Sequence, residues 1–147
     1  MSFNPSRNAV YFNELGRGHL PEHLSVTVLD VGDGFLASTL AVHAHHLAPN
    51  GFLHAASVIA LADTSAGYGC LANLPEGMES FTTIEIKANF VSTITAGEAR
   101  CDARAVHAGR TIQLWEARVI DAATRRLMAT FACTQLLLPS RNRSARS

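Results

Sequence analysis

The sequence predicts a single α+β domain in which an antiparallel β-sheet wraps around one central helix. The first observation is the segment of residues 54–72, which is rich in small residues, apolar on most faces, and bounded by "PNG" and "NLPEG". The second is a set of six strand-like runs, two before this segment and four after it. A helix that is apolar nearly all round has to be enclosed, and the strands supply the layer that encloses it.

Composition limits the function classes. The chain has 147 residues, of which 48% are hydrophobic and 16% charged, as expected for one compact domain. Twelve basic residues balance twelve acidic ones, so no overall field favours nucleic acid or an acidic membrane surface. We expect no signal segment and no membrane span. Cys70, Cys101 and Cys133 are widely spaced and odd in number, which indicates a reducing cytoplasm rather than a disulfide framework.

The elements follow in order along the chain. Residues 1–23 contain "NPSRNAVYFNELGRG", a short N-terminal helix that we expect to act as a cover. Two strands, at 24–31 and 35–45, flank the turn signal "GDG" and open the main domain of residues 24–138. After the helix come "FTTIEIKANFVS", "EARCDARAVHA", "TIQLWEARVID" and "RLMATFACTQLLL", which we interpret as a four-strand meander. Residues 139–147 form a basic tail that we expect to be flexible.

Asp63 is the only charged residue between positions 51 and 74. Burying an unpaired carboxylate costs several kcal/mol, so its place inside an apolar helix needs a reason. One explanation is structural, with Asp63 as the N-cap of a second short helix. The run "HAASVIALAD" has no glycine or proline that would break the helix there. We therefore favour a carboxylate with a perturbed pKa at a functional site.

The start of the same helix is a second candidate. His54, Ala55 and Ala56 follow a Pro-Asn-Gly turn, and the first N–H groups of a helix have no partner within it. Together with the helix dipole they can bind an oxyanion. Nine residues separate His54 from Asp63, which corresponds to about 180° around the helix and about 13.5 Å along it. If both act on one small group, the site combines two subunits, so a homodimer is implied.

The stretch "GFLHAASVIALADTSAG", with "TTIEIKANFVSTITAGEARCDARAVHAGRTIQLWEARVID" after it, resembles hotdog-fold thioesterases of the PaaI type. These are relatives of the phenylacetic-acid-pathway and 4-hydroxybenzoyl-CoA thioesterases. The resemblance covers residues 24–138. It implies a sheet around the central helix, subunits that pair by joining their sheets, usually a homotetramer made of two dimers, and hydrolysis of an acyl-CoA thioester.

The same resemblance implies roles for individual residues. Asp63 matches the acidic nucleophile or general base, and Ala55 matches the residue whose N–H polarises the thioester carbonyl. Thr83 falls where related enzymes carry a Ser or Thr that helps to place water or substrate. Two departures stand out: Ala55-Ala56 replaces the usual pair of glycines, and Ala48 occupies a position that often holds Asn or Gln, for which Asn50 is a candidate substitute.

Two further groups of residues have weaker signals. His43, His45 and His46 have a spacing that could bind a metal, but no carboxylate or cysteine lies nearby in the sequence, so a solvated strand end is the favoured interpretation. Gly109, Arg110 and Thr111 form a tight turn. That turn is either ordinary hairpin chemistry or a contact for the phosphates or pantetheine of CoA.

Together these signals favour an acyl-CoA thioesterase. The predicted catalytic residues are Asp63, Ala55, His54, Thr83 and Asn50. The predicted CoA contacts are Gly109, Arg110, Thr111 and Ala56. No cofactor and no metal are expected, because CoA is part of the substrate. A hydratase or dehydratase on the same fold and a non-catalytic acyl-CoA binder are the alternatives; GxSxG, P-loop and GxGxxG motifs are absent.

Overall fold

The structure is a computed structural model and describes residues 2–140. The described part of the chain folds into helices and strands in the predicted order, with a second short helix before the first strand and a 3₁₀ turn before the central helix. The elements are α1 Ala9–Leu15, α2 Leu20–His23, β1 Val26–Gly32, β2 Phe35–Ala41, η1 Ala44–His46, α3 Ala55–Ala72, β3 Met78–Phe90, β4 Glu98–Ala108, β5 Ile112–Asp121 and β6 Leu127–Pro139. The predicted tail at 139–147 lies outside the described residues from position 141 onward.

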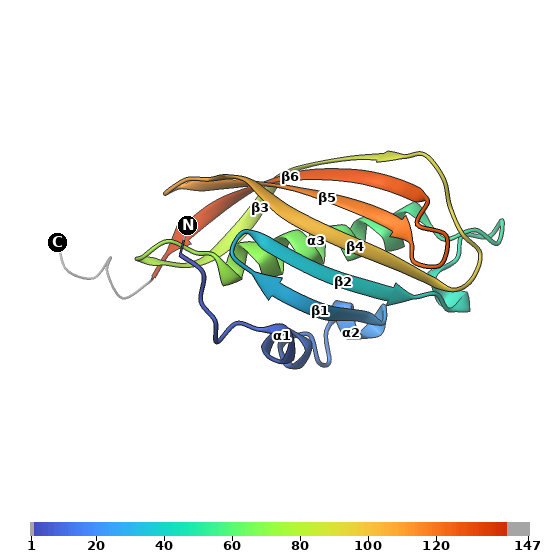
Figure 1. Cartoon of the computed structure of the whole chain (residues 1–147), viewed down its shortest axis with the longest axis horizontal. Coiled ribbons are helices and arrows are strands. Elements are labelled where there is room, and N and C mark those ends of the chain that lie inside the picture. Colours follow the sequence, from blue (N-terminus) through green and yellow to red (C-terminus); the bar gives the residue numbers. More distant parts are fainter. Residues whose placement is uncertain (1, 141–147) are drawn as a thin grey trace.

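All six strands form one antiparallel sheet in the order β1-β2-β4-β5-β6-β3. The predicted four-strand meander is therefore wrong for β3, which pairs with β6 instead of β4. The connection from Phe90 to Glu98 is seven residues long (91–97), more than a tight hairpin needs, and it carries the chain across the end of the sheet. Figure 1 shows this connection arching over the ends of β5 and β6.

Helix α3 lies along the concave face of the sheet, which confirms the predicted fold class (Figure 1). By length and composition alone α3 could cross a membrane, but more than half of it is buried inside the protein. Its small residues let large side chains of the sheet approach its backbone. A Cβ on Gly69 would lie 2.6 Å from the Trp115 ring, and one on Gly67 would lie 2.8 Å from the Phe81 ring. The helix is therefore apolar because the sheet encloses it.

The two edges of the sheet differ. At the β1 edge, α1 packs against the strand, and the side-chain amide of Asn13 both accepts from the N–H of Val28 at 2.8 Å and donates to its C=O at 3.0 Å. Asn13 thus occupies backbone groups that a further strand would need. At the other edge, β3 is thirteen residues long and pairs only with β6 among the described residues. Its apolar side chains Ile84 and Ile86 are 57% and 46% exposed.

Candidate active site

Asp63 lies in the middle of an unbroken helix, because α3 runs from Ala55 to Ala72 without interruption. The alternative in which Asp63 caps a second helix is therefore wrong. Its Oδ1 atom is buried and has no hydrogen-bond partner among the described residues. Burial raises the pKa of the Asp63 carboxyl above its ordinary value. An unpartnered carboxyl with a raised pKa is the kind of group that takes up and returns protons in catalysis.

The start of α3 is exposed, and its first N–H groups are not equivalent. His54 is the N-cap in extended backbone, and its Nδ1 accepts the N–H of Ala56 at 2.9 Å. The expectation that both Ala55 and Ala56 offer free donors is therefore wrong for Ala56, because the imidazole satisfies it. In residues 2–140 the N–H of Ala55 has no such acceptor, and Ala55 is exposed. One free N–H at the positive end of the helix dipole remains available to an oxyanion.

This helix start is held in place by the turn before it. The carbonyl oxygen of His46, which is fully buried, accepts the N–H of His54 at 3.0 Å and the hydroxyl of Ser57 at 2.9 Å. Nδ1 of His46 accepts the N–H of His43 at 2.9 Å. These bonds join the η1 turn to the first turn of α3, so the Ala55 N–H has a fixed direction.

The histidines of this turn do not assemble a metal site. The rings of His45 and His46 are 4.1 Å apart and those of His43 and His45 are 5.9 Å apart. Within the described residues no group of three or more His, Cys, Asp or Glu side chains is arranged to hold a metal ion. Burial, followed by the charges of the neighbouring histidines, lowers the pKa of His46. A neutral His46 fits its place as a fully buried residue of the η1 turn, so the predicted solvated strand end is wrong for His46.

Thr83 lies on β3, and its hydroxyl donates to Oε1 of Gln135 on β6 at 2.7 Å. Nε2 of Gln135 in turn donates to Sγ of Cys133 at 3.4 Å. Cys133 is close enough to Asp63 for the carboxylate charge to contribute to raising the pKa of the thiol to about 12, after burial as the larger cause. The β6 side chains thus connect Thr83 to the neighbourhood of Asp63.

The remaining predicted residues lie away from this neighbourhood in the single chain. Oδ1 of Asn50 accepts the N–H of Phe52 at 3.2 Å, so that side chain stabilises its own turn. The turn of Gly109, Arg110 and Thr111 lies at the opposite end of α3 from His54 (Figure 1). Two residues after the turn, Nε2 of Gln113 donates to the carbonyl of Asn73, directly after the end of α3. One subunit therefore does not bring Arg110 to its own helix start.

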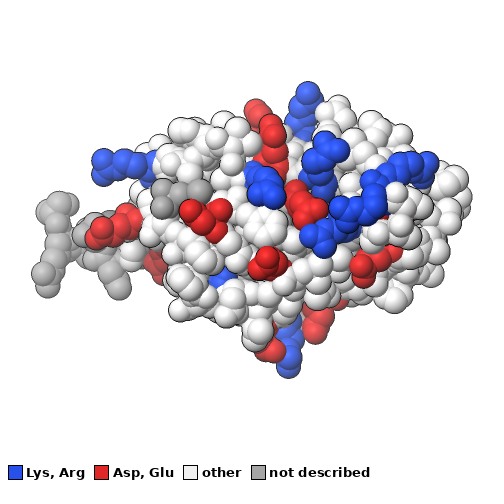
Figure 2. Space-filling model, in the orientation of Figure 1, with Lys and Arg blue, Asp and Glu red and all other residues white. Residues whose placement is uncertain are grey.

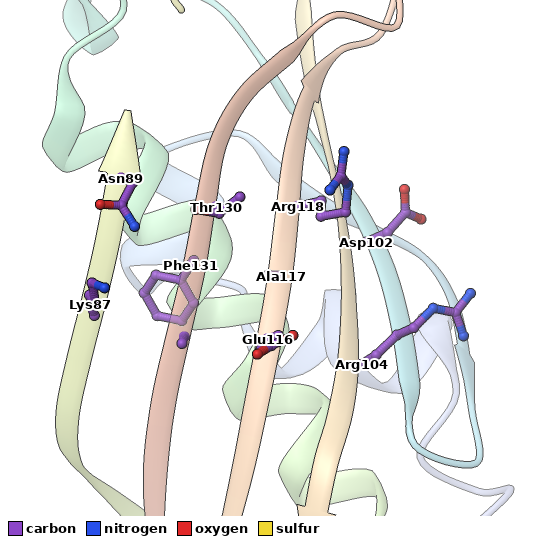
Figure 3. A pocket seen from close by; sticks show the side chains of 10 residues that line it. Lys87, Asn89, Asp102, Arg104, Glu116, Ala117, Arg118, Thr130 and Phe131 are labelled. Atoms are coloured by element: carbon purple, nitrogen blue, oxygen red, sulfur yellow. The ribbon is translucent and has the colours of Figure 1, made fainter. Parts of the chain in front are cut away.

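A groove of about 440 Å³ lies elsewhere, on the outer face of the sheet. Figure 3 shows Lys87 and Asn89 of β3 on one side of it and Glu116 and Arg118 of β5 on the other, with β6 between them. The face in Figure 2 carries acidic and basic side chains next to one another. None of the predicted site residues lines this groove.

Comparison with known proteins agrees with the motif at the helix. Residues 50–128, which include the start of α3 and Asp63, match the family model described as "Thioesterase superfamily". The chain belongs to the thioesterase superfamily. Of the curated relatives, a 1,4-dihydroxy-2-naphthoyl-CoA hydrolase of Escherichia coli is 28% identical over 128 residues, covering 85% of this chain and 91% of that one. A protein of the same name from Listeria monocytogenes is 30% identical over 115 residues, covering 78% and 92%.

The fold agrees as well. A thioesterase of Haemophilus influenzae superimposes with a TM-score of 0.84 at 22% identity, covering 95% of this chain and 93% of that one. The antiparallel sheet around one long helix is thus the hotdog fold of this thioesterase superfamily.

Gln135 and Cys133 are site neighbours that the sequence analysis missed. The run "TFACTQLLL" carried a signal, because strand side chains alternate between two faces. Phe131, Cys133, Gln135 and Leu137 share the buried face, and Gln135 is a polar residue among apolar ones. A buried amide needs hydrogen-bond partners, so it marks a polar contact inside the protein.

Proposed function

We propose that this thioesterase hydrolyses an acyl-CoA thioester to the free acid and CoA. The observation that carries the proposal is that the central helix holds both a half-buried carboxyl at Asp63, whose buried Oδ1 has no partner among the described residues, and a free N–H at Ala55. A base and an oxyanion donor are the two groups that hydrolysis of a thioester needs. Two curated relatives are named as hydrolases of an aromatic acyl-CoA, so aromatic acyl-CoA esters are the first substrates to test.

The active site is shared between two subunits. In α3 eight residues separate Ala55 from Asp63, a rise of about 12 Å, so one chain does not bring both to one carbonyl carbon. A second copy supplies the missing group if two β3 strands pair across a twofold axis. The open β3 edge with exposed Ile84 and Ile86 favours this pairing, whereas Asn13 closes the β1 edge. The proposed assembly is a homodimer, and two dimers form a homotetramer.

The chemistry follows from this arrangement. The thioester oxygen accepts the N–H of the partner subunit's Ala55, where the helix dipole stabilises the charge that develops in the tetrahedral intermediate. Asp63 takes a proton from a water molecule as that water attacks the carbonyl carbon. When the C–S bond breaks, the proton passes from Asp63 to the departing thiolate. The products are the carboxylic acid and the free thiol of CoA.

His54 supports the oxyanion site through its cap. Because its Nδ1 accepts the Ala56 N–H, the first turn of α3 is satisfied except at Ala55. The turn at Gly109, Arg110 and Thr111 is proposed to contact CoA at a site formed with the helix start of the other subunit. The proposal includes a cytoplasmic location and no cofactor beyond the substrate's own CoA.

The direct test is release of thiol from a panel of aromatic, short-chain and long-chain acyl-CoA esters. We expect turnover of at least one class by the wild type and a kcat about 10²–10⁴-fold lower for Asp63→Asn. Binding of acyl-CoA without thiol release would support a non-catalytic binder instead. Consumption of an enoyl-CoA with the thioester intact would support a hydratase.

The shared site is tested by complementation. Asp63→Asn lacks the base, and Ala55→Pro lacks the N–H donor while proline is tolerated at the first position of a helix. Each variant alone should be inactive. A heterodimer of the two, isolated with two different tags, contains one site with both lesions and one with neither, so we expect about half of the wild-type activity per dimer. Folded heterodimers without activity would overturn the shared site.

A further inference from the structure

We propose that Gln135 is a positioning residue that fixes the hydrogen-bond polarity of Thr83, so that Thr83 receives a hydrogen bond from the attacking water. This inference rests on the proposed function, because it assigns a role within the same hydrolytic step. It assigns a role in this step to a residue of β6, in addition to those of α3 and β3.

Gln135 is buried, and both ends of its side-chain amide are hydrogen-bonded. Its side chain is fully buried on β6, and its Oε1 accepts the Thr83 hydroxyl at 2.7 Å. Its Nε2 donates to Sγ of Cys133 at 3.4 Å, and with the amide in this orientation Oε1 faces Thr83. A carbonyl oxygen can only accept, so the Thr83 proton is committed to Gln135. The hydroxyl of Thr83 can then only accept from a further partner.

The packing of β3 against α3 places Thr83 level with Asp63. Phe81 of β3 packs against Gly67 of α3, and β3 runs back along α3 because only a short turn joins them. Moving from Gly67 to Asp63 is a shift of four helical residues, or about 6 Å toward the start of α3. Moving from Phe81 to Thr83 is a shift of two strand residues, or about 6.6 Å in the same direction. The two side chains therefore flank the same level of the site.

The backbone of β3 is irregular directly after Thr83. The pairing of β3 with β6 is regular from Ser80 to Thr83 and again from Glu85 to Phe90, with a register shift between Thr83 and Glu85. Such a β-bulge twists a strand locally and re-aims the side chains beside it. Thr83 still pairs with Gln135, so the irregularity begins directly after the residue whose hydroxyl is fixed.

A water between Thr83 and Asp63 then has one orientation. It donates one proton toward the carboxylate of Asp63 and the other toward the hydroxyl oxygen of Thr83. With both protons donated, one of its lone pairs points to the thioester carbon held by the partner subunit's Ala55. With Gln135 absent, the Thr83 proton is free to point at the water or at Asp63, and the water loses this orientation.

The neighbouring strand offers a matched control. Gln113 of β5 is also fully buried and pairs in register with Gln135. Its amide is used differently, because Nε2 donates to the carbonyl of Asn73 and Oε1 accepts from Nε1 of Trp115 at 2.8 Å. Gln113→Met removes a buried amide from the same core without touching Thr83.

The test is a double-mutant cycle in kcat. We expect Gln135→Met and Thr83→Val each to lower kcat about tenfold, the loss that one hydrogen bond in the transition state produces, with KM and the Kd for CoA unchanged. The double variant should be no slower than Thr83→Val alone, because both changes remove one contact. Gln113→Met should lower Tm but retain wild-type kcat. If Gln135→Met does not fold, Gln135→Leu in the same cycle provides the comparison.

The outcomes separate the two proposals. Wild-type protein that releases no thiol from any ester would overturn the proposed function itself. An active wild type in which Gln135→Met keeps the kcat of Gln113→Met would overturn the positioning role alone. So would losses that multiply in the double variant, because Gln135 would then act independently of Thr83.

Discussion

The substitution Asp63→Asn should make the protein more stable at neutral pH while removing its activity. In the wild type, Oδ1 of Asp63 is buried without a partner, and burial raises the pKa of the carboxyl. Asp63 is half-buried, so replacing its unpaired carboxylate with a neutral amide of the same shape should raise the free energy of unfolding by about 1–2 kcal/mol after allowance for solvent screening. For a domain of this size that corresponds to an increase in Tm of about 2–10 °C. As general base, its loss should lower kcat about 10²–10⁴-fold.

The sign of the pH dependence follows from linkage. A carboxyl with a raised pKa in the folded state binds its proton more tightly there than in the unfolded chain, so wild-type stability falls as pH rises from about 3.9. The fall is complete above the raised pKa of Asp63. Chemical unfolding of both proteins at neutral and at acidic pH measures the difference, which should vanish below about pH 3.9. An Asp63→Asn protein that is no more stable than the wild type at pH 7 would show that the carboxylate is compensated, and the reasoning from its burial would fail.

Two further predictions concern CoA and the core. Arg110→Ala should raise KM for the CoA ester with little change in kcat, since a turn residue that meets a phosphate contributes to uniform binding; unchanged KM in low salt would leave Arg110 as a solvated turn residue. Gly69→Ala should lower the free energy of unfolding by about 1–3 kcal/mol, because its Cβ would lie 2.6 Å from the Trp115 ring, whose Nε1 is bonded to a buried amide. Gly67→Ala should cost less, since Phe81 is only partly buried and can shift. Unfolding in denaturant ranks the pair, and equal costs would contradict this account of the core.

The fold could be predicted because its strongest signals are local. An apolar, small-residue helix and six alternating runs are visible in the sequence, and they are enough for a sheet around a helix. The pairing of β3 was not predictable in this way. Alternation shows which residues share a face of a strand, but it does not show which strand lies beside it. The partner of β3 is β6, which is separated from it in the sequence by β4 and β5, and no local feature of the sequence specifies this partner.

The candidate site shows the same division. Asp63 was identifiable because a single carboxylate in an apolar run is a local anomaly. The hydrogen bond from the Ala56 N–H to Nδ1 of His54 was not identifiable from the sequence, because it depends on the orientation of the His54 ring. The Thr83–Gln135 bond joins residues 52 positions apart, so it depends on strand register, and the register depends on the whole sheet.

The side chain of Asn13 has a consequence for how large an assembly can grow. A sheet with two open edges can add subunits at both ends and has no natural limit, which leads to fibres. Here the two bonds between Asn13 and Val28 occupy backbone groups of the β1 edge, which leaves β3 as the open edge among the described residues. In the homodimer proposed above, two β3 edges pair with each other, so the continuous sheet would stop growing at twelve strands. The side-chain amide of Asn13 thus opposes the addition of further strands to the sheet at β1.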